Sequence, residues 1–250
     1  MRCQAGAENM LCPDFSLPTF ATIFSPFCSL SVRIPVGLGA SHPSTGSMNK
    51  LIVEFIGTFF LVQAVGYAAL SQGPLGALAV GLMLMVMVYA GGHISGAHYN
   101  PAITLAVWLR GKLPKSEVLP YIDAQVAGAV VSAMIVTRFR GQGSETLLTH
   151  PLRVAGAEFL GTFALAWVVL NVATAKSTAG NSFYGAAIGM TVGTGALLFG
   201  GISGAVFNPA VAIAGGILNL LPLQTVALYL VVCSVAGLAA AKLFLRIEKR

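Results

Sequence analysis

The sequence predicts an all-α integral membrane protein with six transmembrane helices and two re-entrant half-helices. Three observations support this fold class: an apolar composition, a set of long apolar stretches and a duplicated motif. Charged residues make up 9% of the chain and hydrophobic residues 56%, and the mean hydropathy is +0.82. Soluble domains carry about 25% charged residues. A soluble domain of 250 residues could not keep so much apolar surface away from water.

Six apolar stretches are long enough, or nearly so, to cross the hydrocarbon core, which takes roughly 20 helical residues. We predict these spans at 51–70, 75–90, 118–137, 152–174, 183–200 and 223–245. The apolar pieces 101–109 and 209–218 are too short to span, so we interpret them as half-helices that enter from opposite faces. The second and fifth spans are short and contain glycine, and each leads directly into the loop before a half-helix.

The tripeptide Asn-Pro-Ala begins both half-helices, and Ser-Gly-Ala stands just upstream of each copy. The six residues of the two copies are Asn100, Pro101, Ala102, Asn208, Pro209 and Ala210. A second duplication, Glu-Phe-x-Gly-Thr-Phe, begins at Glu54 and again at Glu158. Each half therefore has the order span, span, half-helix, span. Because each half has an odd number of spans, the second half must enter the membrane inverted.

The chemistry of Asn-Pro-Ala predicts a specific role for the two loops. Asparagine is a good N-cap, and proline is tolerated at the first helical position. If each Asn oxygen caps its own half-helix, its NH₂ group is left to point away. Two donors and two positive helix ends then meet at mid-membrane. A water molecule that accepts hydrogen bonds from both Asn NH₂ groups directs its own hydrogens outward along the pore, which interrupts proton hopping. The positive helix ends also repel cations.

The distribution of basic residues predicts the orientation. With the amino terminus inside, nine Lys and Arg residues near the spans face the cytoplasm and three face outward. We therefore expect a multi-pass protein of the cell membrane (plasma or inner) with both termini cytoplasmic. The net charge of +6 follows from this topology. A nucleic-acid partner is not expected, because no soluble module carries a basic face.

Residues 1–47 differ from the rest in being rich in Ser, Pro, Phe and Cys and in lacking periodicity. We interpret them as an N-terminal extension that is disordered or an over-called start, since Met48 directly precedes the first span. A targeting segment is the alternative, although a basic n-region and a clean apolar h-region are weak here. The predicted channel domain is then 48–250, with inverted repeats at 48–140 and 150–250.

The duplicated Ser-Gly-Ala-x-x-Asn-Pro-Ala loops, the paired Glu-Phe-x-Gly-Thr-Phe segments and the six spans resemble the aquaporin family, also called major intrinsic proteins. The resemblance covers roughly residue 48 to the carboxyl terminus. It implies a water channel that works as a homotetramer with one pore per subunit and without a cofactor. It also implies that Glu54 and Glu158 support the loops and that His98 lines the cytoplasmic vestibule. A proton relay through the glutamates, and a merely hydrogen-bonded loop histidine, are the alternatives.

The chain departs from the family where selectivity is usually set. Most members carry an Arg directly after the second Asn-Pro-Ala, but here that position is Val211. Matching the chain to the family gives Val80, Ala196 and Ala205 as the other three filter positions. Four small or medium apolar side chains imply a wider and less polar constriction that sets the size limit. The Asp that glycerol facilitators carry soon afterwards is also absent, because Val211 is followed by Ala212 and Ile213.

The sequence thus predicts a passive channel for water, with small uncharged solutes as further candidates. One alternative is a facilitator of glycerol or similar neutral solutes with a wide filter. A second, from another class, is a coupled secondary transporter, which would need an ion-coordinating or titratable cluster at mid-membrane. A gated ion channel would need rings of carbonyls or charges. We find no metal-binding spacing, nucleotide loop or nucleophile elbow, so no metal site, cofactor, catalytic residue or enzymatic activity is expected.

Overall fold

The computed structural model describes residues 46–71, 73–145 and 150–248. Except for its last two residues, the predicted extension 1–47 lies outside the described part of the chain. The described residues make up almost all of the predicted channel domain.

Six long helices and two short ones make up the fold of the residues that the structure describes. The long helices are α2 (Ser47–Ser71), α3 (Gly76–Ser95), α5 (Lys115–Arg140), α6 (Pro151–Val169), α7 (Tyr184–Ser203) and α9 (Leu223–Glu248). A π-turn, η2 (Leu170–Thr174), extends α6, and a 3₁₀ turn, η3 (Lys176–Thr178), follows it. The short helices are α4 (Pro101–Leu109) and α8 (Pro209–Ile217). All six long elements are apolar and long enough to cross a membrane, as predicted.

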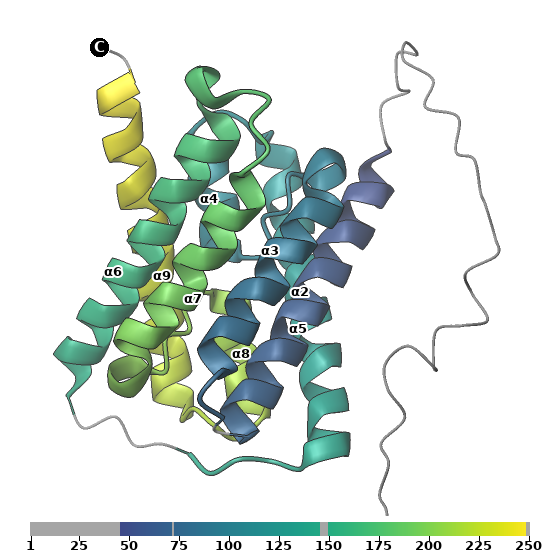
Figure 1. Ribbon diagram of the computed structural model, residues 1–250, viewed down its shortest axis with the longest axis vertical. Coiled ribbons are helices and arrows are strands. Elements are labelled where there is room, and N and C mark those ends of the chain that lie inside the picture. The colour runs from purple at the N-terminus through teal and green to yellow at the C-terminus, as the bar shows by residue number, and fades with distance from the viewer. Residues whose placement is uncertain (1–45, 72, 146–149, 249–250) are drawn as a thin grey trace, which may run out of the picture. The chain divides into compact units, whose positions relative to one another are not determined.

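The long helices surround the two short ones, which lie end to end inside the bundle (Figure 1). In the first half α2 packs against α3 and α5, and in the second half α6 packs against α7 and α9. Each short helix also packs against the last long helix of the other half, α4 against α9 and α8 against α5. The two halves are therefore interlocked through their half-helices.

Glycine allows α3 and α7 to approach closely where the two halves meet. A Cβ atom added to Gly81 would lie 2.7 Å from the Gly189 carbonyl oxygen and 2.8 Å from the Gly193 Cα. Real Cβ atoms essentially never approach other atoms this closely. Small residues at a spacing of four permit such contacts between membrane helices. The spacing of Gly185, Gly189 and Gly193 thus serves helix packing.

The helices extend one to five residues beyond most of the predicted ends, and the second span differs most. We expected the second span to end at residue 90, but α3 continues to Ser95. Gly91 and Gly92, just beyond the predicted end, are helical, and Gly91 lies against the hydroxyl group of Tyr99. At the end of α6 the helix widens into η2, where the side-chain Nδ2 of Asn171 donates to the Trp167 carbonyl oxygen over 2.8 Å.

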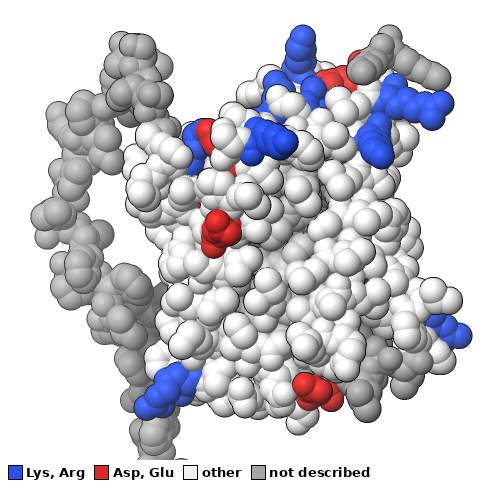
Figure 2. Space-filling model, turned by 180° about the vertical axis from the view of Figure 1, so that it is seen from behind, with Lys and Arg blue, Asp and Glu red and all other residues white. Residues whose placement is uncertain are grey.

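Charged side chains gather at the two ends of the molecule, with an almost uncharged belt between them (Figure 2). The end at which α2 begins and α9 ends carries more of the basic residues (Figures 1 and 2). Two ion pairs lie there, Lys50 with Glu117 at 3.0 Å and Arg110 with Glu248 at 2.5 Å. The belt has the apolar character that a bilayer requires.

Candidate pore

The two Asn-Pro-Ala segments begin the half-helices in the same way. The side-chain oxygen of Asn100 accepts a hydrogen bond of 2.9 Å from the Ala102 amide, and that of Asn208 accepts one of 2.9 Å from Ala210. Both asparagines have extended backbones and are followed by proline at the first helical position. This is the N-cap geometry that satisfies an otherwise unpaired helical N–H group.

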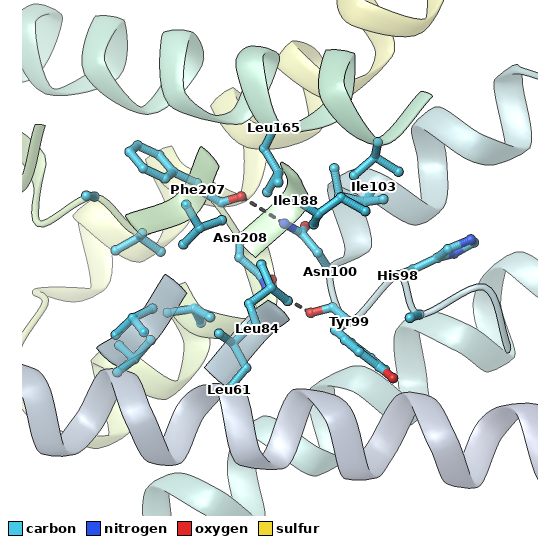
Figure 3. Close-up of a pocket in the computed structure, with 18 residues that line it drawn as sticks. Leu61, Leu84, His98, Tyr99, Asn100, Ile103, Leu165, Ile188, Phe207 and Asn208 are labelled. Atoms are coloured by element: carbon cyan, nitrogen blue, oxygen red, sulfur yellow. Dashed lines mark hydrogen bonds between the residues drawn. The ribbon is translucent and has the colours of Figure 1, made fainter. Parts of the chain in front are cut away.

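The two asparagines also join the loops to each other (Figure 3). Asn100 Nδ2 donates to the Phe207 carbonyl oxygen, and Asn208 Nδ2 donates to the Tyr99 carbonyl oxygen, both over 2.9 Å. A carboxamide NH₂ group carries two hydrogens. Each asparagine therefore donates one N–H to the opposite loop and has a second N–H available for another acceptor. The sequence had predicted that the whole NH₂ group would be available.

Glu54 holds the first loop from inside the bundle. Its Oε1 accepts from the Ser95 hydroxyl group over 2.7 Å and from the His98 amide over 2.9 Å. Its Oε2 accepts from the Tyr99 amide and from the Gln125 side chain, both over 2.7 Å. The carboxylate is fully buried, and it accepts from the backbone amides of His98 and Tyr99, which have no helical partner.

Glu158 repeats this arrangement in the second loop. It accepts from the Ser203 hydroxyl group at 2.7 Å, the Val206 amide at 2.9 Å and the Phe207 amide at 2.6 Å. The fourth neighbour is the thiol of Cys233, with its sulfur 3.7 Å from Oε2. Thiols are weak donors, so the second carboxylate is held less firmly on this side than the first.

One tyrosine in each half supports the end of the helix that leads into the loop. Tyr121 donates to the Ser95 carbonyl oxygen over 2.8 Å, and Tyr229 donates to the Ser203 carbonyl oxygen over 2.5 Å. The separation of the two tyrosines along the chain equals that of the two Asn-Pro-Ala segments, so the tyrosines are counterparts in the repeat.

The loops contain backbone conformations that L-residues seldom adopt. Ala97, Tyr99, Ala205 and Phe207 all have φ angles near +50°, between 49° and 51°. Such residues cost about 1–3 kcal/mol each and persist where the surroundings hold them. The hydrogen bonds to the two glutamates and two asparagines supply that restraint. They fix the carbonyl groups of Tyr99 and Phe207 in the positions that the asparagines bind.

Three cavities follow one another through the bundle. The central chamber, of about 30 Å³, contains Asn100 and Asn208. The outer mouth, of about 1010 Å³, shares Val65, Val206 and Val211 with the chamber. The inner mouth, of about 620 Å³, shares His98, Val169 and Ile188 with it. We name the mouths after the predicted orientation.

The predicted filter positions lie in different surroundings. Val80, Ala205 and Val211 line the central chamber, and Val211 also lines the outer mouth. Ala196 does not line any of these three cavities, although it lies on the same helix as Ile188 and Val192, which do. His98 lines both the chamber and the inner mouth, and its Nδ1 is 3.2 Å from the Thr104 hydroxyl oxygen.

Sequence reasoning missed several contacts of the site. Gln125 on α5 is a buried donor to Glu54 on α2, a contact that the motifs did not indicate. The roles of Tyr121 and Tyr229 were not foreseen, although their spacing, which matches that of the Asn-Pro-Ala copies, could have revealed them. Within the described residues, no group of three or more His, Cys, Asp or Glu side chains could hold a metal ion.

Comparisons with known proteins agree with this architecture. The family model described as major intrinsic protein matches residues 69–198 and 148–250. The aquaporin NIP1-3 of Oryza sativa subsp. japonica is 41% identical over 194 residues, which cover 71% of this chain and 67% of the relative. The aquaporin NIP3-1 of Arabidopsis thaliana is 36% identical over 193 residues, which cover 69% of this chain and 59% of that protein.

A solved structure shows the same fold. The X-ray structure of the aquaglyceroporin from Plasmodium falciparum aligns with a TM-score of 0.69 at 21% sequence identity, covering 80% of this chain and 96% of that one. At this identity the likeness concerns the fold alone, and it confirms the predicted bundle of six spans and two inverted half-helices. The family match covers well over half of the chain. The chain is a multi-pass membrane protein and belongs to the major intrinsic protein family.

Proposed function

We propose that this chain is a passive channel that conducts water and small uncharged solutes down their gradients. The observation that carries the proposal is the pair of asparagines in the central chamber, each with one amide N–H fixed on the opposite loop and one left over. The family, which consists of passive transporters and not enzymes, supports the same class.

The central chamber suits single-file water. Its volume of about 30 Å³ is enough to hold ordered water but leaves little room beyond it. A water there accepts from the remaining N–H groups of Asn100 and Asn208 and directs its own hydrogens toward the two mouths. Because its neighbours on either side are then oppositely oriented, a proton cannot hop along the chain of waters. The N-terminal ends of α4 and α8 add positive potential against cations.

The outer filter of this channel is apolar and lacks a fixed charge. We assign it to Val80, Ala196, Ala205 and Val211, of which three line the central chamber. Small side chains there favour passage of glycerol-sized neutral solutes as a second activity. A coupled transporter is less well supported, because the chamber lining contains no Asp, Glu, Lys or Arg.

The setting of the channel is also part of the proposal. We assign both termini to the cytoplasm and the protein to the plasma or inner membrane, since the more basic end of the bundle is the end at which α2 begins and α9 ends. We propose a homotetramer with one pore per subunit, as the family resemblance implies. The channel domain is assigned to 48–250, with repeats 48–140 and 150–250, and 1–47 to an extension.

Stopped-flow light scattering on proteoliposomes carrying the full chain tests the proposal. With an impermeant osmolyte, these liposomes should shrink several-fold faster than empty ones. The variant Leu84→Trp would place a large ring in the central chamber and should abolish the difference. Leu82→Trp is the matched control, because Leu82 lies on the same helix but is 40% exposed on the outer surface. Shrinkage equal to that of empty liposomes would refute water conduction.

A further inference from the structure

The central chamber is built from the same positions in both halves. Its 18 lining residues fall into pairs separated by one of the two repeat spacings, that of the Glu-Phe-x-Gly-Thr-Phe copies or that of the Asn-Pro-Ala copies. The pairs are Leu61 and Leu165, Val65 and Val169, Val80 and Ile188, Leu84 and Val192, Ala97 and Ala205, His98 and Val206, Tyr99 and Phe207, Asn100 and Asn208, and Ile103 and Val211. Differences between the two sides of the chamber therefore come from the residue that each half places at a shared position.

The four filter positions thus have counterparts on the other side of the asparagines. We call the filter positions the outer ring and their counterparts, found by the spacing of the Asn-Pro-Ala copies, the inner ring. The inner ring consists of Ile188, Val88, Ala97 and Ile103, which correspond to Val80, Ala196, Ala205 and Val211 of the outer ring. In two pairs the inner ring has Ile where the outer ring has Val. In a third pair the inner ring has Val where the outer ring has Ala, and in the fourth both rings have Ala. The inner ring therefore carries four more side-chain carbon atoms, two of them at the chamber-lining positions Ile103 and Ile188.

The inner ring is also more deeply buried than the outer ring. All four inner-ring residues are buried, whereas Ala196 and Ala205 of the outer ring are partly exposed. Figure 3 shows Ile103 and Ile188 toward the His98 end of the chamber, away from the Phe207 ring.

We infer that solutes are selected by size on the inner side of the asparagines, at Ile103 and Ile188, and not at the outer ring. This inference rests on the proposed function and names the step that limits solute size. In a chamber of about 30 Å³, a single methylene group is a large fraction of the space. The β-branch of isoleucine restricts its χ1 rotation, so these side chains do not swing aside easily.

Both isoleucines stand on rigid supports. Ile103 lies in the first turn of α4, which Asn100 caps and which packs against α5 and α9. Ile188 lies on α7 beside Gly189, where α7 meets α3 at closest approach. The inner side is also more polar, because His98 stands where the outer side has Val206. It therefore offers a narrow apolar passage beside one group that can hydrogen-bond a solute.

Matched pairs of substitutions in full-length proteoliposomes test the inference. The inner variant, Ile103→Val with Ile188→Val, gives the inner side the residues of the outer side. The outer variant, Val80→Ala with Val211→Ala, removes more carbon atoms than the inner variant does. Ile52→Val with Ile56→Val is the surface control, since these residues of α2 are 49% and 44% exposed. Water, glycerol and erythritol rates are measured for each.

We expect the inner variant to raise the rates of glycerol and erythritol at least threefold relative to water. The outer variant should raise them less, and the surface control should leave the ratios unchanged. A larger rise in the outer variant would overturn the inference and return size selection to the outer ring, with water conduction intact. A wild-type water rate equal to that of empty liposomes would instead refute the proposed function itself, so the two failures are distinguishable.

Discussion

Gln125 and Cys233 stand at equivalent positions of the two halves, and each contacts the carboxylate that holds its own loop. Gln125 Nε2 lies 2.7 Å from Glu54 Oε2, whereas Cys233 Sγ lies 3.7 Å from Glu158 Oε2. The amide also donates to the Thr104 hydroxyl group over 2.9 Å. The first loop is thus tied to its half-helix by a strong donor, and the second loop has only a thiol at that place.

This asymmetry predicts unequal costs of substitution. Gln125→Leu removes one of four donors from a fully buried carboxylate and should destabilise the fold by about 1–3 kcal/mol, the cost of a lost hydrogen bond to a buried group. Cys233→Ala removes a weak donor and a small apolar side chain, so its effect should be smaller. Thermal unfolding of both variants in detergent gives the comparison. Equal midpoints would contradict the difference in loop support.

Asn208→Asp should weaken the exclusion of cations and protons. Aspartate keeps an oxygen that caps α8, but it loses the N–H that binds the Tyr99 carbonyl and the N–H left for water. Its negative charge also opposes the positive helix ends. We expect a several-fold rise in proton flux, read from an entrapped pH dye, together with slower water conduction. Asn219→Asp is the control, because Asn219 bonds Gly143 at the turn after α8. An unchanged proton flux in Asn208→Asp would argue against orientation of water by the asparagines.

Val211→Arg should narrow the outer ring and add a fixed positive charge. Val211 is shared by the central chamber and the outer mouth, so a long basic side chain there reaches the path of the solute. We expect the glycerol rate to fall several-fold while the water rate falls less. Val211→Ile separates added volume from added charge and should have the milder effect. Equal losses for water and glycerol in Val211→Arg would indicate simple obstruction.

Gly81→Ala should destabilise the contact between α3 and α7. The added methyl group would lie 2.7 Å from the Gly189 carbonyl oxygen, and that atom belongs to a backbone that cannot move alone. Overpacking of this kind costs about 1–3 kcal/mol. Gly156→Ala on α6 is the matched control, since a Cβ there meets no atom within 4 Å. The thermal midpoint of Gly81→Ala should fall well below that of Gly156→Ala, and a reversed order would exclude close packing as the reason for Gly81.

Much of the fold follows from apolar length and from the duplicated motifs. The half-helix at 101–109 has the predicted bounds, because Asn and Pro mark its start locally. The end of α3 was placed too early, just before the glycines at 91 and 92. Gly91 leaves room for the Tyr99 side chain, which reaches it from the loop, and Gly92 lies against the ring of Tyr184. Such a tertiary contact leaves no local signal.

The site was less accessible to sequence reasoning than the fold. The spacing of the Asn-Pro-Ala copies indicated that the two loops meet, but not that each asparagine binds the carbonyl of the opposite loop. That geometry depends on positive φ angles at Tyr99 and Phe207, and neither residue type favours them. The comparison of rings likewise required the chamber, because only the structure shows that its lining consists of repeat counterparts.

The crossed asparagine bonds have a consequence for the order of assembly during synthesis. The Asn100 amide and the Tyr99 carbonyl find their partners far later in the chain, at Phe207 and Asn208. At roughly 5–20 residues per second, the ribosome needs several seconds to reach them. During that interval the first loop has a capped helix and a seated carboxylate, but no partner for these two groups. The loop of the first half therefore lacks these two hydrogen bonds until the second half has been synthesised and has folded against it.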